Sequence, residues 1–144
     1  MLPIILDSDG LSALSDDVPS VAARAILTHA WADGRDVLVP AVVCAEVARG
    51  TARTRRVETA IAGRQVRGRP RQAVQVVDTD LDLAKGVGAV LHGAKADSRD
   101  IVDAHVVAVA VRHGGGLVIT SDSDDILRLS AATPTARIST RRAR

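Results

Sequence analysis

The sequence has almost no aromatic residues: they make up 1% of its 144 residues, with one Trp and neither Phe nor Tyr. Proteins that recognise RNA by stacking its bases on a sheet need exposed aromatic rings. The composition therefore argues against that class. Because hydrophobic residues still make up 47% of the chain, the core must be built from Ala, Val, Leu and Ile.

Cysteine and long apolar runs are also scarce. The single cysteine, Cys44, excludes an internal disulfide framework and a cysteine-cluster metal site. No apolar run approaches the roughly 20 residues that span a bilayer, and the acidic segment Met1–Asp9 is too short for a signal peptide. We therefore expect a cytoplasmic protein with no membrane partner.

The formal net charge is only +2, but the charges are unevenly distributed along the chain. Eight arginines and one acid, Glu58, lie between Arg49 and Arg71, whereas aspartates cluster in 7–9, 97–103 and 122–125. Separate basic and acidic clusters suggest an anionic partner and a bound cation, as in a metal-dependent enzyme that acts on phosphates. A solvated, arginine-rich helix face is the alternative explanation.

Short apolar strands alternate with helical segments, which predicts an α/β fold with a mostly parallel sheet in a three-layer α/β/α sandwich. The expected strands are 2–6, 37–39, 74–77 and 117–120, with an edge strand at 136–139. The expected helices are 19–33, 41–49, 54–65, 81–92, 101–113 and 126–129. We expect a polar turn at 7–10, a glycine loop at 114–116, and one domain over 1–140 followed by a frayed basic tail at 141–144.

Two acids directly follow expected strands. Asp7 ends the first strand, and Asp122 follows the strand at 117–120. The carboxyl ends of parallel strands form the edge at which such sheets bind ligands. Taken singly, each carboxylate is equally explained as a cap of the turn or helix that follows it.

Further acids lie on expected helices. Glu46 is the only charge in the apolar window 42–48, so it is either buried beside a cation or turned to solvent near Arg49. Asp103 lies in a helix that is apolar on nearly every side, which predicts that it is buried. Asp100 shares its helical face, and two neighbouring buried acids repel each other unless a cation lies between them.

A parallel sheet would bring the two strand-end acids and the helical acids Glu46 and Asp103 to one edge. Oxygen ligands without a His or Cys pattern suit Mg²⁺ or Mn²⁺. The four histidines have no metal-ligand spacing. The hydroxyl residues beside the acids would orient water or phosphate, or make ordinary turn hydrogen bonds; they are Ser8, Thr120 and Ser121.

The ordered motifs resemble those of the PIN-domain ribonucleases, and among them the VapC-type toxins of bacterial toxin–antitoxin pairs. The matching segments are 5–8 (ILDS), 42–49 with Glu46, 103–108 (DAHVVA) and 118–122 (VITSD). The resemblance implies a PIN-like fold and a metal-binding acidic set with one additional acid beside it. That set is Asp7, Glu46, Asp103 and Asp122, and the additional acid is Asp100.

The resemblance also implies an activity and partners. A carboxylate-bound Mg²⁺ or Mn²⁺ would activate a water that attacks an RNA phosphodiester. The arginines that follow Glu46 would bind the RNA backbone; they are Arg49, Arg53, Arg55 and Arg56. A cognate antitoxin protein and a homodimer are expected as well.

Two other hypotheses compete with a ribonuclease. Residues 6–10 (LDSDG) are similar to the motif of haloacid-dehalogenase-like phosphatases, in which Asp7 would be the nucleophile and Asp9 the acid/base. Those enzymes need a hydroxyl residue, then a Lys, then a distal acid pair, but both lysines of this chain precede Thr120. The second hypothesis is a non-catalytic, PIN-like binding module.

Overall fold

The computed structural model describes residues 1–144 and contains one five-stranded sheet in the order β3-β2-β1-β4-β5. Every strand pairs with its neighbours in parallel. The strands are β1 (Ile4–Leu6), β2 (Val37–Pro40), β3 (Gln75–Val77), β4 (Gly115–Thr120) and β5 (Arg137–Arg142). The predicted parallel α/β sheet is thus confirmed, and its strand order reverses between β1 and β4, where such folds bind ligands.

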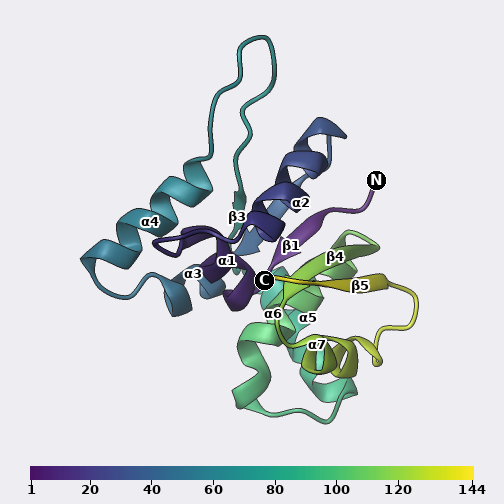
Figure 1. The fold of residues 1–144 in the computed structure, drawn as a ribbon. Coiled ribbons are helices and arrows are strands. Elements are labelled where there is room, and N and C mark those ends of the chain that lie inside the picture. Colours follow the sequence, from purple (N-terminus) through teal and green to yellow (C-terminus); the bar gives the residue numbers. More distant parts are fainter.

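Helices cover both faces of the sheet (Figure 1). One layer consists of α1 (Ser8–Ser15), α2 (Val21–Ala32) and α4 (Thr51–Ala62). The other consists of α5 (Leu81–Gly93), α6 (Ile101–Arg112) and α7 (Ser123–Ser130), with the short helix η1 (Ser98–Asp100) leading into α6. Helix α3 (Ala41–Val47) lies between the layers and contacts both α1 and α6.

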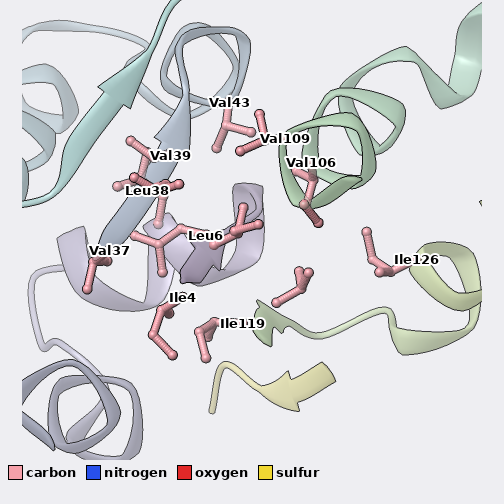
Figure 2. Packing of buried hydrophobic residues seen from close by; sticks show 14 of the residues in the cluster. Ile4, Leu6, Val37, Leu38, Val39, Val43, Val106, Val109, Ile119 and Ile126 are labelled. Atoms are coloured by element: carbon pink, nitrogen blue, oxygen red, sulfur yellow. The ribbon is translucent and has the colours of Figure 1, made fainter. Parts of the chain in front are cut away.

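The central strand β1 is the middle of the core. Its three residues, Ile4–Leu6, have no exposed surface, because β2 and β4 flank the strand and helices cover both of its faces. Figure 2 shows Leu6 among the aliphatic side chains of β2, Val43 of α3 and Val106 of α6. The aliphatic core that the composition requires is therefore packed around the strand that ends at Asp7.

Helix α1 replaces the polar turn that we predicted at residues 7–10. Asp7 caps this helix, and its Oδ1 accepts a hydrogen bond of 2.8 Å from the Gly10 N–H. A Cβ at Gly10 would lie 2.5 Å from the Ile119 carbonyl oxygen of β4. The prediction was wrong because this glycine, which suggested a turn, permits a close approach of helix to strand.

The last two strands also differ from expectation. Strand β4 begins at Gly115, inside the expected glycine loop, and β5 continues to Arg142, inside the expected frayed tail. Arg141 and Arg142 pair in register with Ile119 and Thr120 of β4, and Ala143 is fully buried. The tail is ordered because strand pairing satisfies its backbone, which a count of its charges does not reveal.

No helix of the structure has the length and apolar composition that crossing a membrane would require.

Candidate metal centre at the carboxyl edge of the sheet

Asp7 lies where the buried strand β1 meets helix α1, and it is 4% exposed. Burial is the main cause that raises its pKa from 3.8 to about 6, because a charged carboxylate loses hydration there. Hydrogen bonds from the Thr120 hydroxyl and the Gly10 N–H oppose this rise by stabilising the charged form. Asp7 is thus held in place by Thr120, at the end of β4, and by Gly10, in α1.

Thr120 connects the ends of β1 and β4. Its side chain is fully buried, and its hydroxyl oxygen accepts a hydrogen bond of 2.9 Å from the Asp122 N–H while the hydroxyl contacts the Asp7 carboxylate. Asp122 in turn caps helix α7, since its Oδ1 accepts from the Asp125 N–H. Asp122 and Ser121 are both exposed. Thr120 therefore fixes the two strand-end acids relative to each other.

Asp103 lies in the first turn of α6, half-buried at the same edge. Desolvation is again the largest cause that raises its pKa to about 6. The next causes are repulsions from four other carboxylates, in the order Asp7, Asp125, Asp122 and Glu46. The charges of the other acids at this edge thus act together to raise the pKa of Asp103.

We call this set of five carboxylates the acidic edge: Asp7, Glu46, Asp103, Asp122 and Asp125. Glu46 is exposed on α3 rather than buried, and its charge still contributes to the raised pKa of Asp103. Asp125 was missing from the sequence prediction. Its place one helical turn after Asp122, which was predicted as a ligand, was the available signal.

Asp100, expected as an additional acid, has a partner inside the protein. Its Oδ1 lies 2.8 Å from Nη2 of Arg128, and the same nitrogen lies 3.2 Å from Oδ1 of Asp125. Arg128, on α7, therefore links Asp100 to the acidic edge through Asp125. This pairing could not be predicted from the sequence, because Arg128 lies 28 residues after Asp100 and on another helix.

The donor set of the acidic edge fits a hard divalent cation. All donors are oxygens, which Mg²⁺ and Mn²⁺ prefer, and the mutual repulsion at Asp103 is what a cation would relieve. Beside Asp7, the hydroxyl oxygen of Ser8 is buried without any hydrogen-bond partner, which is unusual for a buried polar atom. No three Asp, Glu, His or Cys side chains already converge as a complete ligand group.

The arginines expected to bind RNA fall into two groups. Arg49, Arg53 and Arg55 are exposed and form no ion pair, whereas Arg56 is already engaged within the protein. Its Nη1 lies 2.8 Å from Oδ1 of Asp17, and its Nε donates to the Ser15 carbonyl at 3.0 Å. Arg56 therefore ties α4 to the end of α1.

A groove of about 610 Å³ lies between the end of α1, α2 and α4. Its lining includes the apolar side chains of Leu14, Leu27 and Trp31, several arginines, and the two aspartates Asp16 and Asp17. The arginines are Arg24, Arg55, Arg56 and Arg64. The groove thus combines apolar side chains with an excess of arginines over aspartates.

Comparison with known proteins identifies the family. The sequence model of the PIN domain matches residues 4–131, which includes the whole acidic edge, so the chain belongs to the PIN domain family. Proteins of this family are generally nucleases, and such nucleases generally use divalent metals. The predicted family resemblance is confirmed, and the haloacid-dehalogenase-like alternative is set aside. No curated protein matches the chain in sequence.

Two solved structures share the fold over nearly the whole chain. The structure described as FitAB bound to an IR36 DNA fragment is 20% identical with a TM-score of 0.62, over 97% of this chain and 94% of that chain. DNA-bound VapBC from Salmonella typhimurium is 18% identical with a TM-score of 0.65, over 97% of this chain and 98% of that chain. The strand order and both helical layers are therefore those of a PIN-like fold.

Proposed function

We propose that this PIN domain is a metal-dependent endoribonuclease that acts as the toxin of a toxin–antitoxin pair. The observation that carries the proposal is that the charges of four other carboxylates raise the pKa of the half-buried Asp103, beside the point where the strand order reverses. A structural role alone does not explain this arrangement, because repelling, partly desolvated acids reduce the stability of the folded state. A site that binds a cation does explain it.

The residues proposed to hold Mg²⁺ or Mn²⁺ are Asp7, Glu46, Asp103 and Asp122, with Asp125 as a further acid at the same edge. When bound, the cation supplies Lewis-acid activation of water and neutralises the charge that develops on the phosphate. Oδ1 of Asp7 already accepts from the Gly10 N–H, so this hydrogen bond orients the carboxylate toward the edge. Thr120 keeps Asp7 and Asp122 in register, and Ser8 offers a buried hydroxyl to a water or phosphate oxygen.

The proposed RNA substrate would lie across the acidic edge with its backbone against α4. Arg49 and Arg53 are near the start of this helix, three and seven residues after Glu46, and both are exposed and free of ion pairs. Guanidinium groups bind phosphate oxygens with two parallel hydrogen bonds. In this proposal Arg55 adds a further contact, and Arg56 contributes mainly through the position of α4, because its side chain is bound to Asp17.

The proposed antitoxin would occupy the groove between α1, α2 and α4. Both similar structures are assemblies described by paired names, FitAB and VapBC, which supports a protein partner. Apolar side chains beside an excess of arginines over aspartates suit a peptide segment that carries both aliphatic and acidic side chains. A homodimer and a cytoplasmic location, where RNA substrates are available, complete the proposal.

The decisive experiment is a cleavage assay on a mixed RNA substrate, with EDTA, Mg²⁺ or Mn²⁺. We expect cleavage only with the divalent metals and none by Asp103→Asn. Asp33→Asn is the matched control, because Asp33 is exposed at the end of α2 and does not affect the pKa of Asp7 or Asp103. Retained RNA or antitoxin binding without any metal-dependent cleavage by the wild type would instead establish the non-catalytic binding module.

A further inference from the structure

The connection between α4 and β3 forms a protruding ribbon, residues 63–74, which we call the arginine arm. Figure 1 shows it extending well beyond the ends of α2 and α4. Its base is closed by two backbone hydrogen bonds of 3.0 Å between Arg64 and Gln72, and by an Arg71 Nε–H donated to the Ala62 carbonyl at 2.8 Å. The base of the arm is thus an ordered, hydrogen-bonded pair of antiparallel segments.

The tip of the arm is a tight turn that its own side chains close. The Arg69 N–H donates to the Val66 carbonyl at 3.1 Å, and the Gln65 amide donates to the carbonyls of both residues. Gly68 has φ of +75° and open space where a Cβ would be. The turn therefore places two exposed arginines, Arg67 and Arg69, on either side of a glycine.

The arm carries four positive charges and no negative charge. Its arginines are Arg64, Arg67, Arg69 and Arg71. None of them forms an ion pair, although five other arginines of the chain do. Four unmatched charges on one ribbon repel each other, so the sequence of the arm favours an anionic partner over a purely structural role.

The arm lies far from the acidic edge. It leads into the amino end of β3, whereas the acids follow the carboxyl ends of β1 and β4 in the same parallel sheet. Helix α4 separates the two regions, and its 12 residues span roughly 18 Å. The partner of the arm is therefore not the phosphate that would be cleaved.

We propose that the arginine arm binds the minor groove of A·T-rich duplex DNA, with Arg67 and Arg69 inserted into the groove. Narrow A·T-rich minor grooves concentrate negative potential and attract inserted arginines. The groove is only about 6 Å wide, and Gly68 keeps the tip slim between its two arginines. The basic residues of the arm are all arginine and none is lysine, which suits planar insertion into a groove.

Other nucleic acids fit the arm less well. Single-stranded RNA is usually held by stacking on aromatic rings, and the chain's one candidate, Trp31, donates its Nε1–H to the Ala73 carbonyl at 3.2 Å in a partly buried position. Duplex RNA has a wide, shallow minor groove that a narrow tip does not fill. The narrow, arginine-flanked tip therefore favours duplex DNA over both.

The proposal is tested by fluorescence anisotropy with the full-length chain in EDTA, which makes the result independent of any nuclease activity. The probes are duplex DNA of 20 base pairs with an A·T or a G·C centre, and single-stranded RNA of equal length. We expect binding to the A·T duplex at least about tenfold tighter than to the G·C duplex, because the arginines discriminate by groove width.

Two variants and a matched control sharpen the test. The double substitution Arg67→Gln and Arg69→Gln should weaken A·T binding about tenfold or more and lower the salt slope by about two. Gly68→Asn should weaken A·T binding without changing the net charge, because it widens the tip while Asn tolerates the positive φ of this position. The control, Arg141→Gln with Arg142→Gln, removes two exposed, unpaired arginines from β5 and should leave the A·T preference intact.

Three results would overturn the proposal. Equal affinity for both duplexes would mean that the arm contacts phosphates only. No measurable binding to the A·T duplex would exclude the DNA partner. Loss of single-stranded RNA binding, rather than DNA binding, in the arm variant would assign the arm to the RNA.

Discussion

The acidic edge and the arginine arm differ in how the protein holds its charges. At the acidic edge, burial and repulsion raise the pKa of Asp7 and Asp103 to about 6, and hydrogen bonds from Thr120 and Gly10 keep Asp7 in place. In the arm, four arginines project into water and contact only the backbone or Gln72. The comparison teaches that a cluster of like charges affects stability more strongly where it is partly buried than where it is exposed, because water screens exposed charges.

The largest expected effect is the loss of activity in Asp103→Asn. Removal of the carboxylate at the centre of the acidic edge should lower metal-dependent RNA cleavage by more than about 100-fold. The melting temperature in EDTA should stay equal or rise, because the substitution removes repulsion from four neighbouring carboxylates. Cleavage rates and thermal melts measure the two effects. A marked loss of stability would show that Asp103 has a structural role instead.

The second effect is an unusual pH dependence of stability in the metal-free protein. Folding raises the pKa of Asp7 and Asp103 from 3.8 to about 6, so the folded state binds more protons than the unfolded state between these values. Their contribution to the free energy of unfolding is largest below pH 4 and is lost as the pH rises through 6. Each group contributes at most about 3 kcal/mol.

Urea unfolding in EDTA from pH 4 to 8 would measure this dependence. The difference between wild type and Asp103→Asn isolates the acidic edge from other carboxyls, such as Asp80, whose pKa is lowered by the Leu83 N–H. Mg²⁺ should reverse the trend near pH 7, because the cation favours the charged carboxylates. A difference that does not vary with pH would contradict the assignment.

The third effect tests packing beneath the acidic edge. Gly10→Ala should destabilise the protein by about 1–3 kcal/mol, because the new Cβ would meet the Ile119 carbonyl oxygen. Gly88→Ala on α5 is the matched control, since no atom lies within 4 Å of its Cβ position. This control should stabilise the protein by up to about 1 kcal/mol, because alanine favours a helix. Denaturant midpoints would distinguish the two variants, and equal midpoints would argue against close packing at Gly10.

The smallest effect separates the two kinds of arginine on α4. Arg56→Gln should lower stability by about 1 kcal/mol or less and leave the salt dependence of RNA binding nearly unchanged, because Arg56 is bound to Asp17 and Ser15. Arg53→Gln should leave stability unchanged and lower the salt slope by about one, since Arg53 has no ion pair. Binding titrations at several salt concentrations measure this. The opposite pattern would show that Arg56 releases Asp17 to bind RNA.

Much of the architecture could be predicted because strands and helices leave local patterns. Apolar runs marked β1 and β2, and acids that follow strands in a parallel sheet must lie at one edge. Helix α1 could not be predicted, because Ser8–Gly10 has the composition of a turn and becomes helical only where Gly10 packs against β4. The helical acid Asp125 was also missed, because its proximity to Asp103 depends on how α6 and α7 pack.

By itself the sequence determined the aliphatic core, the alternation of strands and helices, and the presence of strand-end acids and an arginine-rich segment. Only the tertiary structure decided the strand order, which brings Asp7 and Asp122 together through Thr120. It also decided that Arg128 pairs with Asp100, and that residues 63–74 form a ribbon remote from the acids. The physical reason is the separation along the chain of the residues involved. Hydrophobic periodicity is a local property of the sequence, whereas strand pairing, burial and the interactions between charged side chains depend on residues far apart in the chain.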